Sequence, residues 1–229
     1  IRLQINVDGL PLFKSSSVQF WPILCSAKGT DKVFAIGIYS GKEKPSDVNA
    51  FLSLFVDDTK TILANVFESH NAKRTCKLDA VICDAPARAF ITGVKNHTGY
   101  YGCGKCEVKG KYTDHRVVFL KTNCELRTDE SFRQKKQPGH HNQSTKLEEL
   151  NIDLVRDVPF EYMHLVCIGV TKKRLQFWVH GKKKSCRLGS KAILKVSKRL
   201  ENKKKVIPCE FVRKPRSLAE IDRWKATEL

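Results

Sequence analysis

The sequence has no apolar run that approaches the roughly 20 residues needed to span a bilayer, and its first residues lack the pattern of a secretory signal peptide. It also lacks a basic amphipathic helix with a clear apolar face, which disfavours an acidic membrane surface as partner. Acidic residues are scarce, with 24 Asp and Glu against 42 Lys and Arg. We therefore expect an intracellular protein, nuclear or cytoplasmic, with no membrane partner.

A disulfide framework is absent as well, because the nine cysteines are odd in number and lack dense, regular spacing. Most of them should be reduced thiols. The formal charge of +18 predicts an electropositive surface whose natural counterpart is a polyanion. Nucleic acid fits best, because phosphate neutralisation with release of counterions rewards many scattered Lys and Arg side chains.

The hydrophobic pattern predicts an α/β fold. Strands are expected where apolar residues alternate with polar ones or form short runs, at residues 2–8, 17–26, 32–40 and 77–84. Helices are expected at residues 45–69 and 86–94, where Pro86 suits a first helical turn. The order of three strands, helix, strand and helix is the layout of an RNase H-like mixed sheet with flanking helices.

The rest of the chain divides by composition. We expect an RNase H-like core with a zinc-hook insertion at residues 1–120, a polar insertion or exposed loop at 121–150, and a helical basic segment at 151–229. In the last segment, helix is expected over 152–180 with a kink at Pro159, lysine runs stand at 182–184 and 203–205, and Ser217 is expected to cap a final helix. The start at Ile1 and the end inside an expected helix indicate a fragment of a longer product.

Two aspartates follow predicted strands. Asp8 ends the first strand, and Asp84 ends the apolar run at 80–83. If the two strands are neighbours, their carboxylates can hold Mg²⁺ or Mn²⁺, hard cations that prefer oxygen ligands and support phosphodiester chemistry. The alternative is that Asp8 belongs only to a turn before Gly9 and that Asp84 only caps a helix.

Cys103 and Cys106 form a C-x2-C pair in a Gly-, Lys- and Tyr-rich stretch. The spacing is typical of a zinc hook that needs two further ligands. His164 and Cys167, three residues apart on a predicted helix, are the first candidates, although packing in the core is an equal alternative for them. The less direct candidates are His97, His115, His140 and His141.

Several stretches resemble, in order, the catalytic region of CACTA (En/Spm-type) DNA transposases. They are VDGLPLFKSSSVQFWPIL, CDAPARAFITGVKNHTGYYGCGKC, RTDESFR, DVPFEYMHLVCIGVTKK and CEFVRKPRSLAEIDRWKATEL, and together they cover most of the chain. The resemblance implies an RNase H-like fold with a DDE/D triad that binds two divalent metal ions and cuts and joins DNA. Asp8 and Asp84 match the first and second acids, and the C-x2-C pair matches a zinc hook in more distant relatives.

The third acid that the resemblance implies lies on a late helix. Glu228 is the expected position, with Glu220 and Asp222 as alternatives. The Asp-x-x-His motif of the family matches residues 161–164, with Glu161 in place of Asp and His164 as the histidine. Because the chain ends one residue after Glu228, we expect the active-site shape with little activity, since catalysis needs closely held geometry.

Two functions follow. The first is a DDE-type transposase catalytic core, or its degenerate, domesticated remnant, that acts on DNA phosphodiesters with Mg²⁺ or Mn²⁺ and carries structural Zn²⁺. The second is a non-catalytic nucleic-acid or chromatin-binding module with the same basic surface and zinc site. DNA is the expected partner in both, and a homo-oligomer is a further candidate assembly.

Overall fold

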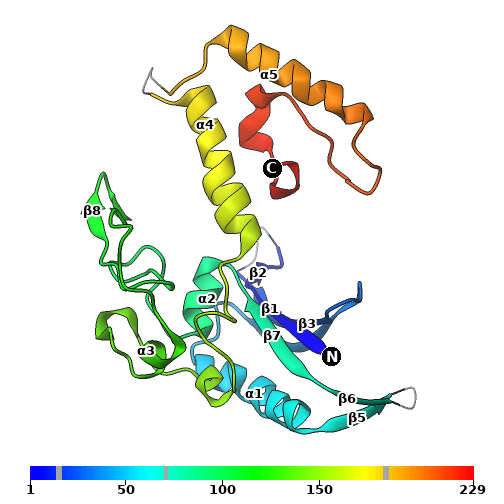
Figure 1. The fold of residues 1–229 in the computed structure, drawn as a ribbon, viewed down its shortest axis with the longest axis vertical. Helices are drawn as coiled ribbons and strands as arrows, with labels where there is room; N and C mark the ends of the chain where they lie inside the picture. Colours follow the sequence, from blue (N-terminus) through cyan, green and yellow to red (C-terminus); the bar gives the residue numbers. More distant parts are fainter. Residues whose placement is uncertain (14–16, 70–71, 183–185) are drawn as a thin grey trace. The chain divides into compact units, whose positions relative to one another are not determined.

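The computed structural model describes residues 1–13, 17–69, 72–182 and 186–229. The chain forms two compact units, Ile1–Phe160 (unit 1) and Glu161–Leu229 (unit 2). Each unit has its own hydrophobic core. Figure 1 shows the course of the chain with its helices and strands. None of the helices in the described ranges is both long and apolar enough to cross a bilayer.

A mixed, open β-sheet forms the centre of unit 1. Its strands are β1 (Arg2–Val7), β2 (Leu10–Pro11), β3 (Gln19–Ala27), β4 (Val33–Gly41) and β7 (Lys77–Ile82). Strand β3 pairs antiparallel with both β1 and β4, whereas β7 pairs parallel with β1. The predicted α/β class and the antiparallel arrangement of the first three long strands are confirmed.

The sheet continues for a short distance beyond β7. Cys83 forms a parallel bridge with Phe160, and the Val81 N–H donates to the carbonyl oxygen of Asp157 at 2.8 Å. From β4 the order across the sheet is therefore β4, β3, β1, β7 and the short segment that ends at Phe160. This segment was expected to be helical, and that prediction is wrong for residues 152–160.

Two helices of unit 1 form where they were predicted, and both end earlier than predicted. Helix α1 (Val48–Ala64) begins after Asp47, whose Oδ1 accepts from the Asn49 and Ala50 N–H groups at 2.8 and 3.2 Å. Its buried side includes Leu52, which is fully covered in the core that also contains the sheet. The helix ends earlier than expected because Asn65 is extended and opens the hairpin of β5 (Val66–Ser69) and β6 (Ala72–Thr75). Helix α2 spans Ala85–Ile91.

Residues 121–150 were expected to form an exposed polar loop, but they fold onto the core. They carry α3 (Asp129–Arg133) and two 3-10 turns, η1 (Pro138–His140) and η2 (Lys146–Glu149). Phe132 and Leu147 are buried in the main core. Arg133 fastens the segment, because its guanidinium donates to the backbone carbonyls of residues 148, 150 and 152. The polar composition of this stretch did not indicate that the Arg133 side chain would hydrogen-bond these backbone carbonyls.

Asp153 explains why residues 152–160 are not helical. Its Oδ1 accepts from the Val155 and Arg156 N–H groups at 2.9 and 2.7 Å, which forms a local turn. Side chains that bond nearby backbone in this way compete with helix formation. Pro159, three residues after Arg156, disfavours a helical conformation for Val158.

Unit 2 is helical and has a small core. Its elements are the π-helical stretch η3 (Met163–Lys172), α4 (Lys173–His180), α5 (Ser190–Asn202), η4 (Lys203–Lys205), η5 (Leu218–Arg223) and η6 (Ala226–Glu228). The buried apolar residues are Val179, Leu218, Ile221 and Trp224. Ser217 caps the last segment as predicted, but this segment is 3-10 rather than α-helical. Of the first lysine run, residues 183 and 184 lie outside the described residues.

Candidate functional site

Asp8 and Asp84, the two acids predicted to follow strands, lie at the same end of the neighbouring parallel strands β1 and β7. The register of β1 against β7 pairs Asn6 with Ile82, and Asp8 and Asp84 each lie two residues further along. Neighbouring strands are about 4.8 Å apart, so this register directs the chain to the same sheet edge at both aspartates. The register therefore places at one sheet edge two positions that the sequence separates by β3, β4, α1 and the β5–β6 hairpin.

Both carboxylates also have local structural roles. Oδ1 of Asp84 accepts from the Ala87 N–H at 2.7 Å and caps α2, where Pro86 occupies the first turn as predicted. Oδ1 of Asp8 accepts from the Gly9 N–H at 2.8 Å. A capping carboxylate still has a second oxygen atom, so a cap and a metal ligand are compatible roles for one side chain.

The carboxylates of Asp84 and Asp8 both affect the pKa of the Cys83 thiol. It is 1% exposed, and its pKa is raised to about 12, chiefly by burial. A hydrogen bond with the Val7 backbone lowers this pKa, and the nearby carboxylates of Asp84 and Asp8 raise it further. Cys83 therefore stays protonated at neutral pH.

Glu228, the expected third acid, lies in unit 2 and is held by an arginine. Its two carboxylate oxygens accept from Arg216 Nε and Nη2 at 2.7 and 2.9 Å, and Oε2 also accepts from the Lys225 N–H at 2.8 Å. The side chain is only 2% exposed. Its pKa is lowered, first by the hydrogen bonds with Arg216. Metal binding by Glu228 would compete with this bidentate ion pair.

The two alternatives for the third acid are also engaged within unit 2. Oε2 of Glu220 lies 3.7 Å from Nη1 of Arg216. Asp222 accepts from Gln176 Nε2 at 2.8 Å and lies 3.1 Å from His180. All three candidates therefore have partners inside their own unit.

The cysteine hook lies in unit 1. The sulfur atoms of Cys103 and Cys106 are 3.4 Å apart, and both residues are half-buried. In the described part of the chain, no three His, Cys, Asp or Glu side chains are grouped to hold a metal ion. His164 and Cys167 belong to unit 2, where His164 Nδ1 lies 2.8 Å from Glu161 Oε2 and Cys167 is buried.

Buried arginines surround the hook, and sequence reasoning missed them. Arg88 and Arg127 are 6% and 4% exposed. Arg127 Nη2 donates to the carbonyl oxygens of Cys103 and Cys106 at 3.4 and 3.2 Å. Among the described residues, Nε of both arginines and Nη1 of Arg127 have no hydrogen-bond partner. Burial lowers the pKa of both guanidinium groups. At Arg127 the Glu107 carboxylate acts in the opposite direction, followed by Cys103 and Cys106, and at Arg88 Cys103 does the same.

Buried cations need negative charge nearby. Deprotonated thiolates of Cys103 and Cys106 would supply that charge, and zinc is the usual reason for a cysteine pair to be deprotonated at neutral pH. The residues around the hook therefore fit a zinc-thiolate group. A sequence signal for this was weak, because Arg88 and Arg127 look like ordinary members of a basic chain.

His140 and His141 share unit 1 with the hook. His140 is 1% exposed, and its Nδ1 lies 2.6 Å from the Tyr101 carbonyl oxygen. Burial lowers its pKa to about 4, so the ring is neutral and Nδ1 carries the proton donated to Tyr101. In the described ranges, both ring nitrogens of His141 are buried without a partner. A neutral imidazole oriented by a backbone carbonyl is the usual form of a zinc ligand. His97 and His115 are exposed.

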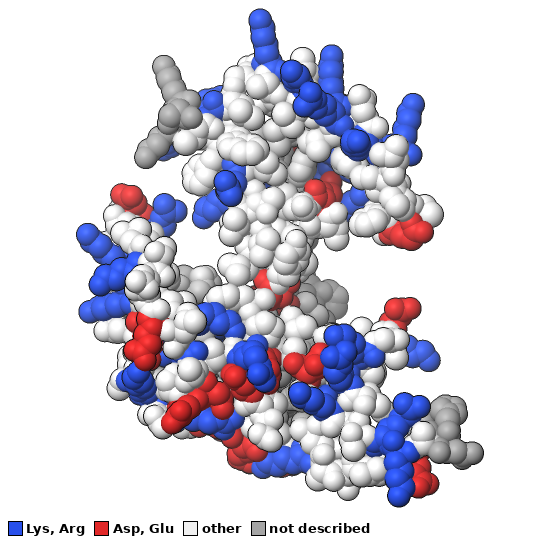
Figure 2. All heavy atoms as spheres, in the orientation of Figure 1, with Lys and Arg blue, Asp and Glu red and all other residues white. Residues whose placement is uncertain are grey.

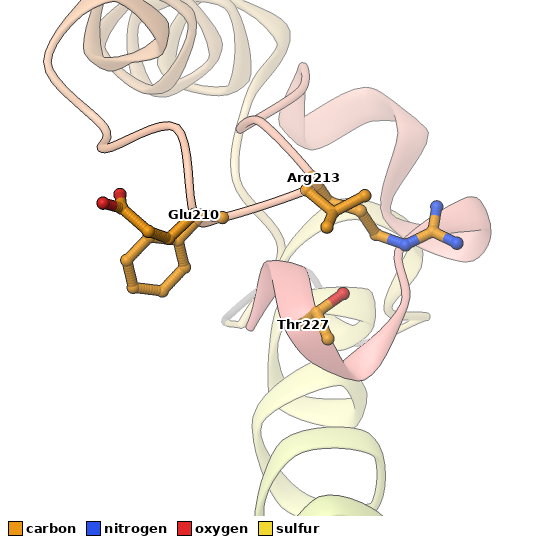
Figure 3. A pocket seen from close by; sticks show the side chains of 5 residues that line it. Glu210, Arg213 and Thr227 are labelled. Atoms are coloured by element: carbon orange, nitrogen blue, oxygen red, sulfur yellow. The ribbon is translucent and has the colours of Figure 1, made fainter. Parts of the chain in front are cut away.

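A pocket in unit 2 contains none of the predicted site residues. Figure 3 shows Glu210 and Arg213 on one connecting segment and Thr227 on η6. Phe211 and Val212 complete the lining, and they are 58% and 94% exposed. The pocket is therefore an open surface feature and adds no chemistry to the site.

No family model matches this chain, and no curated protein matches it either.

Substitutions of Asp84 should separate its capping role from metal binding. Asn caps helices as well as Asp does, so Asp84→Asn should leave stability nearly unchanged, whereas Asp84→Ala should cost about 0.5–2 kcal/mol. Both variants should lose Mn²⁺ binding, followed by electron paramagnetic resonance. Asp47→Ala removes the cap of α1 and is the matched control, which should lose stability but retain Mn²⁺. Wild-type Mn²⁺ affinity in Asp84→Asn would show that Asp84 is only a cap.

Acid should destabilise unit 1 through His140. Its folded pKa of about 4 lies below the ordinary value of 6.5, so the unfolded chain binds the extra proton between these pH values. The free energy of unfolding should therefore fall as pH drops from 6.5, by about 2 kcal/mol at pH 5. Urea denaturation of the full chain at several pH values checks this. His140→Asn should show a smaller fall in the free energy of unfolding as pH drops, whereas His97→Asn should show the same fall as the wild type. An unchanged slope in His140→Asn contradicts the prediction.

Proposed function

We propose that unit 1 is an RNase H-like domain and that the chain derives from the catalytic core of a DDE-type DNA transposase. The observation that carries the proposal is the parallel register of β1 and β7, with Asp8 and Asp84 at one sheet edge. The strand order is further support, because three antiparallel strands followed by two parallel neighbours is the arrangement expected for this fold. Open α/β sheets place ligands at the carboxyl ends of their strands.

The proposed chemistry is phosphodiester cleavage followed by strand transfer. Bound Mg²⁺ or Mn²⁺ would supply charge neutralisation and lower the pKa of the attacking hydroxyl group. Asp8 and Asp84 would hold the cations with carboxylate oxygens, the ligands that such hard cations prefer. In cleavage, a water oxygen forms a bond to phosphorus and the bond to the 3′ oxygen breaks. The oxygen of the released 3′-hydroxyl then forms a bond to the phosphorus of a second phosphodiester, and the bond from that phosphorus to its own 3′ oxygen breaks, so that this oxygen leaves and takes up a proton.

The ion pair of Glu228 with Arg216 determines how much catalytic activity we expect. A third acid would complete the triad, but the ion pair with Arg216 occupies both oxygens of this carboxylate. Catalysis by Glu228 therefore requires that Arg216 release it. This supports a remnant with little activity, and it favours the second candidate function, a non-catalytic DNA-binding module.

Zinc at the hook is part of both candidate functions. We propose that Cys103 and Cys106 bind it as thiolates, because Arg88 and Arg127 are buried beside them and neither guanidinium forms an ion pair within the described residues. His164 and Cys167 remain the ligands proposed from the sequence. His140 is the alternative that its orientation supports. The hook is already joined to the segment around residue 127, because the Arg127 N–H donates to the Lys105 carbonyl oxygen at 3.0 Å.

Plasmid nicking tests the catalytic proposal. The full chain should convert supercoiled plasmid slowly to nicked circles in Mn²⁺, and Asp8→Asn and Asp84→Asn should each reduce the rate by about 10²-fold or more, because each removes charge that stabilises the metal ions. Asp31→Asn, an exposed acid outside the site, is the control and should keep the rate. If wild type and variants all bind DNA equally and none nicks, the non-catalytic module is the correct function.

Metal analysis tests the hook. The purified full chain should contain one zinc ion per molecule by mass spectrometry, and Cys103→Ser should lose it because one thiolate of the pair is gone. Cys209→Ser, which changes an exposed cysteine, should retain zinc. Comparison of His140→Asn with His164→Asn identifies the histidine ligand. Zinc-free wild-type protein that is fully folded would contradict the proposal.

A further inference from the structure

The hairpin of β8 (Lys111–Thr113) and β9 (Arg116–Val118) has two different faces. Its register pairs Lys111 with Val118, Tyr112 with Val117, and Thr113 with Arg116. Side chains alternate between the faces of a strand. Lys111, Thr113, Arg116 and Val118 therefore share one face, which we call the basic face, and Tyr112 and Val117 share the other.

The cations of this hairpin are unpaired. Lys109, Lys111, Arg116 and Lys121 are exposed, and Asp114 is the only acid between residues 109 and 121. Within the described residues, none of these four cations forms an ion pair, whereas Lys60, Lys136 and Arg133 do. Figure 2 shows Lys and Arg side chains gathered around the β8–β9 hairpin, at the left of the view. The hairpin is thus suited to bind an anionic partner.

The tip of the hairpin has a backbone conformation that its residues seldom adopt. Asp114 and His115 form the two-residue turn with φ values of 48° and 61°. Such a turn strongly favours Asn-Gly, and a histidine at the second position costs conformational energy. The exposed imidazole of His115 is held at the tip by this turn, which is the kind of strained placement that occurs at binding sites.

We propose that the basic face of the β8–β9 hairpin binds the backbone of duplex DNA, with the two-stranded ribbon lying in the major groove. This inference rests on the proposed function for its choice of DNA as the polyanion. A two-stranded ribbon fits the major groove of B-DNA, and Lys111, Thr113 and Arg116 provide two cations and a hydroxyl group on one side. A duplex needs only this face, whereas a single strand stacked on an aromatic ring would need Tyr112 on the other face.

Binding of a fluorescent 25-base-pair duplex, measured by anisotropy without added Mg²⁺ or Mn²⁺, tests the proposal. The double variant Lys111→Gln and Arg116→Gln should lose about two units from the slope of log affinity against log salt, because two phosphate contacts disappear. The control variant Lys73→Gln and Arg74→Gln removes the same charge from the β5–β6 hairpin of unit 1 and should leave the slope nearly unchanged. Tyr112→Ala should also bind the duplex as wild type does.

Two outcomes overturn the proposal. Equal losses in the two double variants would mean that binding depends on diffuse charge and not on this hairpin. Weaker single-strand binding in Tyr112→Ala, with wild-type duplex binding in the β8–β9 double variant, would assign the hairpin to stacking on single strands. Circular dichroism confirms that each variant is folded. Because no catalytic metal is added, a negative plasmid-nicking result does not affect this test.

Discussion

The parallel pairing of β1 with β7 is the constraint on which the interpretation of unit 1 depends. Parallel strands cannot be joined by a tight turn, so the chain must cross over between them, and here it does so through β3, β4, α1 and the β5–β6 hairpin. The same pairing fixes which residues lie at the strand ends. A shift of one residue in this register would separate Asp8 from Asp84 along the strand axis. The buried side chains of β1 and α1 hold the register by hydrophobic packing.

Capping couples the site to the fold. Asp84 stabilises the first turn of α2 through the Ala87 N–H, and α2 contributes Ala87, Ala89 and Ile91 to the main core. Arg88 from the same helix is buried next to Cys103 and stacks on Phe160, with its guanidinium carbon 4.7 Å from the ring centre. One short helix therefore carries both the residue that Asp84 caps and the arginine that lies beside the cysteine hook.

Much of the sheet could be predicted from the sequence, because alternating or continuous apolar runs mark β1, β3, β4 and β7 directly. The hydrophobic pattern could not predict how exposed each side chain of the sheet is. Val33 and Ile38 of β4 are 65% and 61% exposed, although their apolar character is typical of a covered strand. For residues 121–150 the prediction was wrong in the opposite direction. This polar stretch was expected to be exposed, but Phe132 and Leu147 are buried. Local composition does not show which backbone carbonyls a distant Arg133 will satisfy.

The candidate site was predictable only in part for a similar reason. Asp8 and Asp84 follow strands, so their shared edge could be inferred once the strands were assumed to be neighbours. The partner of Glu228 could not, because Arg216 looks like any other residue of a basic segment. Pairing between distant charges depends on tertiary structure, which hydrophobic periodicity does not encode.

The charge of the whole chain also bears on the proposed metal site. A formal charge of +18 attracts phosphates, but it repels divalent cations from Asp8 and Asp84. Bound DNA would neutralise much of this field, so binding of DNA and binding of metal should favour each other, and by linkage the coupling is reciprocal. The long-range part of this coupling should weaken as salt rises, because screening shortens the range of the field. Two carboxylates in a cationic protein would therefore bind a divalent metal ion more tightly when the polyanion is present.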